Sequence, residues 1–301
     1  MKQTLSIVLS VHNEEEKIAK ALESVKNFAN EIIVVDNSST DKTAQIAKKY
    51  TKKVFTQKNN PLDIDRQKNF GFNKATKDWT LSLDADEEVS VELAQELQSI
   101  LSQSSSAVAY FIPRKNIIFG KWIEHTGWYP DYQLRLFKTG KRKFGKEHVH
   151  ELLEVYGEKA YLHTDLLHQN YESISQFISR NFLFYAKNEA KNKLQSGYTF
   201  SYLDAFSFPS KEFLSRFFAR EGYKDGLHGL MLSLLMAAYH LAIFAYIWEE
   251  KKFVQTEISL QEIKNAMQNV EKEQAYWLTS SQINEEKNPF KKIMLKTKRK
   301  L

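Results

Sequence analysis

Two hydrophobic spacings alternate along the first hundred residues. Short apolar runs rich in β-branched side chains, typical of buried strands, occupy residues 4–11, 31–36, 54–55 and 79–83. Between the first two runs, Ile18, Leu22 and Val25 recur at the spacing of one helix face. Strands that alternate with helices in this way pair mostly in parallel, so the pattern predicts an α/β fold with a largely parallel sheet.

Polar side chains indicate two helix starts in this region. Ser38 and Asp41 have the spacing of a capping box and predict a helix through residues 44–47. Ser90 predicts the N-cap of another helix. The apolar face of that helix comprises Leu93, Leu97 and Leu101.

The pattern changes after about residue 105. Residues 107–113 and 132–137 are typical of strands, and the segments between them are rich in aromatic residues and glycine. From Ser173 onward the spacing is mostly helical. Internal repeats and low-complexity linkers are absent from the sequence, so it marks no sharp domain boundary.

Composition narrows the class of protein. The chain has 301 residues, of which 42% are hydrophobic, 13% aromatic and 27% charged, which is typical of a folded domain. It contains no cysteine, which excludes disulfides, thiolate-bound zinc and a cysteine nucleophile and fits a reducing compartment. The apolar run at residues 5–11 is short and interrupted by serines, so we expect a first strand rather than a signal peptide.

The net charge of +6 is concentrated near the C-terminus. Residues 251–301 contain eleven Lys or Arg against six Glu, which gives this segment a charge of +5. A segment of this kind attracts an anionic partner, either lipid headgroups or nucleic acid.

Polar clusters follow three of the predicted strands. They are residues 12–14 (HNE), residues 36–39 (DNSS) and residues 84–86 (DAD). Each cluster alone is typical of turns and caps, but ligands bind at the carboxyl ends of parallel strands, where all three clusters would meet. Their joint placement therefore predicts a ligand site.

Asp84 and Asp86 carry the clearest chemistry. Two carboxylates at this spacing on an extended segment can project together, and such hard oxygen ligands suit Mg²⁺ or Mn²⁺ bridging the phosphates of a nucleotide. The charge that develops on a departing diphosphate needs such neutralisation. Glu87 and Glu88 follow directly, and the alternative is an acidic helix start.

These motifs resemble family 2 glycosyltransferases. The resemblance rests on residues 6–15 (SIVLSVHNEE), 31–43 (EIIVVDNSSTDKT), 66–69 (RQKN) and 79–87 (WTLSLDADE), in the order found in that family. It implies the GT-A fold, a Rossmann-like central mixed sheet flanked by helices, here followed by a helical C-terminal region.

The resemblance also implies residue roles. Asp36 would contact the nucleotide base, assisted by the segment His12, Asn13 and Glu14. Asp84 would lie near the ribose and Asp86 on the metal. His12 stands where the family often has tyrosine, which leaves base stacking at this position open.

The middle of the chain resembles one branch of the family. Residues 128–137 (WYPDYQLRLF) and 148–151 (HVHE) are similar to the branch that includes lipopolysaccharide-core glucosyltransferases. We therefore expect a catalytic domain at residues 1–170, a helical acceptor- or membrane-associated region at 171–288 and a basic tail at 289–301.

An inverting transferase needs a group that takes the proton of the acceptor hydroxyl. Glu151 is the first candidate, because it resembles the acidic residue that follows the diaspartate motif, and Asp131 is the second. A structural ion pair is the alternative role for Glu151. His168 resembles a histidine that joins the metal or the diphosphate in some GT-A enzymes, whereas His148 and His150 are expected at the surface or behind the ligands.

Three cations are candidates for phosphate contacts. Arg66 and Lys68 can pair with diphosphate oxygens, and Arg135 with a phosphate or the acceptor. The alternative for the first two is a solvated helix start, which Asp63 and Asp65 could equally stabilise.

The C-terminal third raises the question of a membrane. Residues 230–248 contain nineteen positions without a formal charge, long enough for a transmembrane span. A span would carry the lysine-rich tail across the membrane, against the positive-inside tendency. We therefore expect a helix that packs on the catalytic domain or lies in the bilayer interface, with an ordinary buried helix as the alternative. Residues 216–220 (RFFAR) also fit nucleic-acid binding, but the resemblance favours a lipid-linked acceptor and no nucleic acid.

The sequence thus predicts a metal-dependent, inverting glycosyltransferase. It would move a sugar from a nucleoside-diphosphate donor, UDP in the first instance, to a lipid-linked or lipopolysaccharide-core acceptor at the inner face of the cytoplasmic membrane. Another α/β phosphate enzyme fits less well, because the Asp-x-Asp pair follows the fourth strand and residues 5–16 contain no glycine for a phosphate loop. A non-catalytic sugar or partner binder on the same scaffold is the third hypothesis.

Overall fold

The computed structural model describes residues 3–60, 64–103, 105–143 and 154–300. It divides into two compact units, each with a hydrophobic core of its own. Unit 1 comprises Met1–Asn116 and Pro130–Asn170, and unit 2 comprises Ile117–Tyr129 and Tyr171–Leu301. The functional division at residues 170 and 288 stays a prediction.

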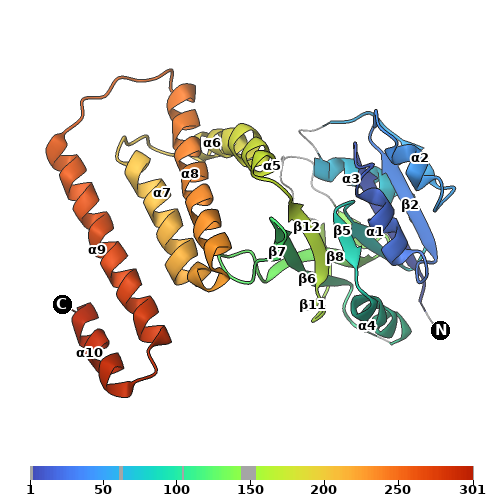
Figure 1. Ribbon diagram of the computed structural model, residues 1–301. Helices are drawn as coiled ribbons and strands as arrows, with labels where there is room; N and C mark the ends of the chain where they lie inside the picture. The colour runs from blue at the N-terminus through green and yellow to red at the C-terminus, as the bar shows by residue number, and fades with distance from the viewer. Residues whose placement is uncertain (1–2, 61–63, 104, 144–153, 301) are drawn as a thin grey trace. The chain divides into compact units, whose positions relative to one another are not determined.

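Unit 1 begins with a parallel sheet in the order β3-β2-β1-β4. The strands are β1 (Leu5–Val11), β2 (Glu31–Asp36), β3 (Val54–Thr56) and β4 (Trp79–Leu83), so the four predicted strands are confirmed. Helices on the sheet are α1 (Ile18–Val25), α2 (Thr43–Ala47), α3 (Ile64–Phe72) and α4 (Val91–Ser102) (Figure 1). The predicted apolar faces of α1 and α4 are fully buried or nearly so, because they cover the β-branched sheet.

One predicted helix start is confirmed and the other is wrong. The Ser90 hydroxyl accepts a hydrogen bond from the Leu93 amide at 3.1 Å and caps α4. Ser38 has a left-handed backbone (φ 56°) and donates to the carbonyl of Gln57, so it cannot adopt the extended backbone of an N-cap. The helix α2 begins only at Thr43, whose amide donates to the Asp41 carboxylate.

Antiparallel strands complete the sheet, which makes it mixed. The strand β8 (Asp131–Lys138) pairs with β4 on one side and with β6 (Ala109–Ile118) on the other, followed by β12 (Leu166–Tyr171) and β5 (Glu87–Val89). Short strands add β7 (Lys121–Trp122) and β11 (Lys159–Tyr161) to β6, and pair β9 (Arg142–Lys143) with β10 (Glu154–Val155). The expected mixed sheet flanked by helices is confirmed, whereas a helix start at Glu87 is wrong, because Glu87 opens β5 and faces the core.

Unit 2 is helical, as expected from Ser173 onward. It contains α5 (Ile174–Ile178), a π-helical turn at Ser179–Tyr185, α6 (Ala186–Gln195) and α7 (Asp204–Leu214). A second π-helical turn (Ser215–Ala219) and a 3₁₀ turn (Gly222–Asp225) lead to α8 (Leu227–Glu250), α9 (Leu260–Glu285) and α10 (Pro289–Lys300). The predicted basic tail is helical over Pro289–Lys300.

The carboxylate of Asp225 ties residues 117–129 to the start of α8. It accepts hydrogen bonds from the amides of His125 at 2.9 Å and Glu124 at 3.3 Å, while its carbonyl accepts from Lys121. These bonds satisfy the amides of residues 124 and 125, which lie outside any strand. They explain why this segment belongs to the helical unit.

Candidate active site

The loops after β1 and β2 are joined by hydrogen bonds through Asn13. Its backbone is left-handed (φ 55°), a conformation that asparagine tolerates better than most residues. Its side-chain oxygen accepts a hydrogen bond from the Thr40 backbone amide at 2.8 Å. Its backbone amide donates to the Ser39 hydroxyl at 3.0 Å. The next amide, of Glu14, donates to Thr43 at 2.7 Å. The predicted cluster at residues 12–14 and the one at 36–39 therefore form one polar edge.

Asp36 lies at the carboxyl end of β2, opposite Val11 of β1, and is almost fully buried. One carboxylate oxygen accepts from the Ser39 amide at 3.2 Å. The neighbouring Asn37 receives the side-chain amide of Gln57 at 2.7 Å, and its carbonyl lies 2.8 Å from Nδ1 of the exposed His12. This buried acid at a strand end fits the nucleotide-contacting position that the sequence predicted.

Asp84, at the end of β4, is held between two cations. It receives Lys68 Nζ at 2.7 Å and an Arg135 guanidinium nitrogen at 2.5 Å. Burial alone raises the pKa of Asp84, but the charges of Arg135 and Lys68 outweigh it and hold that pKa well below its usual range. The helix α3 thus brings Lys68, and the strand β8 brings Arg135, to Asp84.

Arg135 also links Asp84 to a second acid, Glu87. The same guanidinium contacts the fully buried Glu87, whose other oxygen accepts from the Asp84 amide at 2.9 Å. Burial lowers the pKa of Arg135, but Asp84 and Glu87 more than offset this and raise it. Glu87 therefore fixes the Asp84–Asp86 turn rather than extending the acidic surface.

Asp131 is tightly paired within β6 and β8. It accepts from Arg114 Nε at 2.8 Å, Gln133 at 2.7 Å and Asn116 Nδ2 at 3.3 Å. Burial raises its pKa, yet the adjacent Arg114 charge and these hydrogen bonds lower it below the ordinary value. A carboxylate stabilised in its ionised form is a poor proton acceptor, which weighs against Asp131 as the general base.

The orientation of His168 follows from this contact. A carboxylate of low pKa only accepts hydrogen bonds, so Asn116 must present its nitrogen to Asp131 and its oxygen to His168. That oxygen lies 2.7 Å from His168 Nδ1, which must then carry the proton when the ring is neutral. The lone pair of Nε2 faces Asp86, 3.6 Å from its carboxylate oxygen.

Asp86 and His168 are thus the two described side chains that could hold a divalent metal together. An imidazole held by its other nitrogen next to a carboxylate is the usual form of such a site. Within the described ranges, no three His, Cys, Asp or Glu side chains form a complete metal cluster. The pair fits an ion that takes its remaining ligands from phosphate and water, as Mg²⁺ commonly does.

The structure brings together the predicted residues Asp84, Asp86 and His168, but it describes only part of the others. Arg66 lies in the first turn of α3. Glu151, His148 and His150 fall outside the described residues, so the first candidate base stays a prediction. The sequence interpretation missed Arg114 and Asn116, although two polar residues two apart in an apolar strand point to one face and were a usable signal.

A mixed sheet that collects carboxylates and cations at the ends of its parallel strands defines an α/β enzyme with a polar ligand site. The sequence profile of glycosyl transferase family 2 matches residues 6–155. A glycosyltransferase of Rickettsia typhi is 30% identical over 247 residues, covering 77% of this chain and 82% of the relative. The chain belongs to glycosyl transferase family 2 and is a glycosyltransferase, which confirms the resemblance.

Three other proteins are also similar to this chain. The lipopolysaccharide core biosynthesis glycosyltransferase LpsC of Rhizobium meliloti is 26% identical over 259 residues, covering 82% of this chain and 93% of LpsC. Residues 1–349 of S. aureus TarS give a TM-score of 0.40 at 15% identity, covering 85% of this chain and 94% of that one. Glucosyl-3-phosphoglycerate synthase of Mycobacterium tuberculosis, solved with Mn²⁺ and UDP-glucose, gives 0.32 at 22% identity, covering 39% and 44%.

Proposed function

We propose that the protein is an inverting glycosyltransferase that uses a nucleoside-diphosphate sugar, UDP-linked in the first instance, and a lipid-linked or lipopolysaccharide-core acceptor. The observation that carries the proposal is the Asp86–His168 pair beside the Asp84–Lys68–Arg135 group at the end of β4. In this arrangement the residues that would bind a metal lie beside the cations that would bind phosphate, although they come from α3, β8, β12 and the turn after β4. The LpsC relative supports the acceptor class. We place the enzyme in the cytoplasm, on the inner face of the membrane.

Each part of the donor has a matching group. Asp36 would bind the base and Asp84 the ribose. Lys68 and Arg135, which now form salt bridges to Asp84, would bind the diphosphate oxygens, assisted by Arg66 from the same helix as Lys68. These cations stabilise the negative charge that develops on the leaving diphosphate, which is where transition-state stabilisation is most effective.

A bound Mg²⁺ or Mn²⁺ on Asp86 and His168 would neutralise the same diphosphate. Asn116 holds the imidazole with its Nε2 lone pair toward Asp86. Glu151 would take the proton of the acceptor hydroxyl as the sugar is transferred. Asp131 serves instead as a structural anchor, because its oxygens are occupied by Arg114, Gln133 and Asn116.

Thermal unfolding with UDP tests the donor site. At a hundredfold excess over Kd, UDP with Mn²⁺ is expected to raise Tm by about 5 °C or more. Asp86→Ala should remove the part of this gain that depends on the metal, while Glu23→Gln, an exposed change on α1, should leave it. A wild-type protein whose Tm ignores UDP, GDP and dTDP with or without Mn²⁺ contradicts the proposal.

Turnover tests the base. Glu151→Gln should keep the UDP-dependent Tm rise and lose transfer by a factor of about 10² to 10⁴. Asp131→Asn is expected to lower stability more than turnover, because it breaks the partly buried ion pair with Arg114. The reverse result, with full activity in Glu151→Gln, assigns the base to another residue.

A further inference from the structure

From Leu227 to Trp248, the exposed residues of the helix α8 are all apolar. The exposed residues recur every three or four positions, and we call them the apolar seam: Leu227, Met231, Leu234, Ala238, Leu241, Ala245 and Trp248. The opposite face, with Leu232, Ile243 and Ile247, is buried in the core of unit 2. A surface helix in water normally turns charged residues outward, and a helix apolar all round needs apolar surroundings.

The last helix, α10, is basic and amphipathic. Phe290, Ile293 and Met294, at the spacing of one face, are 83%, 63% and 64% exposed. The helix carries six cations and no acid: Lys291, Lys292, Lys296, Lys298, Arg299 and Lys300. Exposed apolar side chains beside cations are the pattern of helices that lie in the interface of an anionic bilayer.

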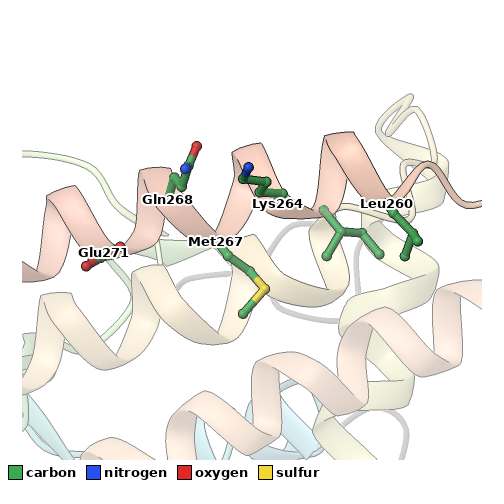
Figure 2. Close-up of a pocket in the computed structure, with 6 residues that line it drawn as sticks. Leu260, Lys264, Met267, Gln268 and Glu271 are labelled. Atoms are coloured by element: carbon green, nitrogen blue, oxygen red, sulfur yellow. The ribbon is translucent and has the colours of Figure 1, made fainter.

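The helix α9 adds apolar surface in the same unit. Figure 2 shows Leu260 and Met267 on one side of α9, with Lys264 and Gln268 on the other. Both apolar side chains are exposed along a shallow hollow of that helix. Most of the large apolar side chains that are exposed within the described residues belong to unit 2, which is the unit without the candidate active site.

We propose that unit 2 docks on an anionic phospholipid bilayer, with the apolar seam of α8 and the apolar face of α10 in the headgroup boundary and the α10 cations on the phosphates. The inference rests on the proposed function, because it gives the lipid-linked acceptor a surface on which to meet the enzyme. Charge complementarity favours an anionic bilayer as the partner. Its phosphates pair with the α10 cations, and its acyl boundary takes up the exposed apolar side chains.

The contacts of α8 favour lying in the interface over spanning the bilayer. By length and composition α8 is the one helix of the described residues that could cross a membrane. Near its middle, however, Tyr239 donates to Glu189 at 2.7 Å and His240 lies 3.6 Å from Glu212. A span would place those acids, on α6 and α7, in the hydrocarbon, where ionised groups are costly.

A second copy of the chain and a nucleic acid fit less well. Helices that pair in water usually carry charges beside their apolar seam, whereas the flanks here hold Leu230, Leu235, Ala242 and Phe244. Nucleic-acid phosphates would meet the α10 cations but leave Ile293 and Met294 in water. Both occupants are outcomes of the test.

Flotation of the full-length protein with vesicles tests the docking. Vesicles of phosphatidylcholine with phosphatidylglycerol should bind the protein, and phosphatidylcholine alone should bind it far less. The variant Lys291→Glu/Lys292→Glu/Lys296→Glu should lose about a hundredfold in affinity or more. The matched variant Lys48→Glu/Lys49→Glu/Lys52→Glu, which changes three exposed cations of unit 1, should bind as the wild type does.

The seam is tested separately with Leu234→Gln/Leu241→Gln. Both residues are exposed, so circular dichroism and Tm should stay close to wild type, while vesicle affinity should fall about tenfold at every salt concentration. Equal vesicle binding by the wild type and by both the α10 and seam variants overturns the proposal. The proposal is also overturned if sedimentation shows that the variants lose a dimer that the wild type forms while they still bind vesicles. It is likewise overturned if single-stranded RNA displaces the protein from vesicles and the variants lose RNA binding but not vesicle binding.

The same samples separate this inference from the proposed function. Both variants should keep the UDP-dependent Tm rise, because they leave unit 1 unchanged. A protein that binds vesicles but ignores UDP contradicts the proposed function and supports docking. A protein that binds UDP but no vesicle contradicts the docking alone.

Discussion

Asn116 determines which nitrogen of His168 is available next to Asp86. Its oxygen lies 2.7 Å from His168 Nδ1, and its nitrogen donates to Asp131 at 3.3 Å. Asn116→Leu removes the acceptor that fixes the imidazole, so we expect Mn²⁺ affinity in the presence of UDP to fall about 10- to 100-fold. Titration calorimetry, or the electron paramagnetic resonance signal of free Mn²⁺, measures this without turnover.

Asn170→Leu is the matched control. Asn170 is as buried as His168, and its side chain donates to the oxygen of Asn116 at 3.2 Å, a bond that leaves this oxygen on His168. The substitution should change Mn²⁺ affinity by less than about threefold, well short of the loss expected when the imidazole itself is released. Equal losses in the two variants would show that packing of the strand, and not the orientation of His168, sets the affinity.

Glu31 makes folding stability depend on pH. Burial raises its pKa, but Lys53, Ser6 and Thr76 donate hydrogen bonds that lower it to about 2. A folded pKa below the unfolded value of 4.5 gives stability that is present above pH 4.5 and lost as the pH falls toward 2. Its contribution at neutral pH is about 3 kcal/mol.

Urea unfolding of Glu31→Gln between pH 2 and 7 checks this. The variant should be less stable at pH 7, and its deficit should shrink between pH 4.5 and 2. Glu23→Gln is the control, because Glu23 pairs with Lys26 in an exposed position on α1 and should matter little. A deficit that stays constant down to pH 2 would mean that Glu31 acts through its shape and not its charge.

Sequence reasoning at this scale found single residues but not their partners. Asp36, Asp84 and Asp86 were predicted because each follows a recognisable strand. The bonds that decide their chemistry join distant positions, such as Arg135 with Glu87 and Asn116 with His168, 48 and 52 residues apart. Spacing within one strand carries no signal of the strand that will lie beside it.

At the scale of elements, α3 depends on a glycine at its contact with the sheet. A β-carbon at Gly71 would lie 2.7 Å from Val8 and 2.9 Å from Val35, both buried. Alanine usually stabilises a helix by about 1 kcal/mol over glycine, but in Gly71→Ala the clash should dominate and destabilise the fold by about 1–3 kcal/mol. Because α3 also carries Lys68, its bond to Asp84 should weaken, which lowers UDP affinity.

A double-mutant cycle of Gly71→Ala with Val8→Ala isolates the contact. Val8→Ala alone leaves a cavity and costs stability, but it also removes the methyl group that the added β-carbon would meet. The double variant should therefore be more stable than the sum of the single losses predicts. If the losses of unfolding free energy in the two single variants add to that of the double variant within about 0.5 kcal/mol, α3 can shift away from Val8 and glycine is not required at position 71.

The elements themselves were largely predictable. The strands β2 and β4 begin and end where the apolar runs do, because burial on both faces leaves an uninterrupted hydrophobic signal. The error at Ser38 arose because a left-handed backbone leaves no mark in the spacing of polar residues. The strand β5 was missed for a similar reason, since its buried glutamate, Glu87, is accounted for by Arg135 and not by local sequence.

At the scale of the molecule, charge and chemistry lie in different units. The net charge is +6, of which residues 251–301 in unit 2 supply +5, while the candidate active site lies in unit 1. Electrostatic attraction to a bilayer is screened by salt, whereas a buried site is screened far less. Ionic strength should therefore act on the meeting of enzyme and membrane and leave the chemical step unchanged.

Transfer to an acceptor embedded in anionic vesicles should show this split. Between about 50 mM and 500 mM NaCl, apparent KM for the vesicle-bound acceptor should rise at least tenfold with kcat unchanged, because docking and not chemistry is screened. Hydrolysis of the soluble donor, measured as release of nucleoside diphosphate, should stay flat over the same range.

The variant Lys291→Glu/Lys292→Glu/Lys296→Glu should begin at high KM and lose most of the salt dependence. If donor hydrolysis falls with salt as steeply as transfer does, the charge of unit 2 is not what brings the enzyme to its acceptor, and the cations at the nucleotide site, Lys68 and Arg135, account for the effect.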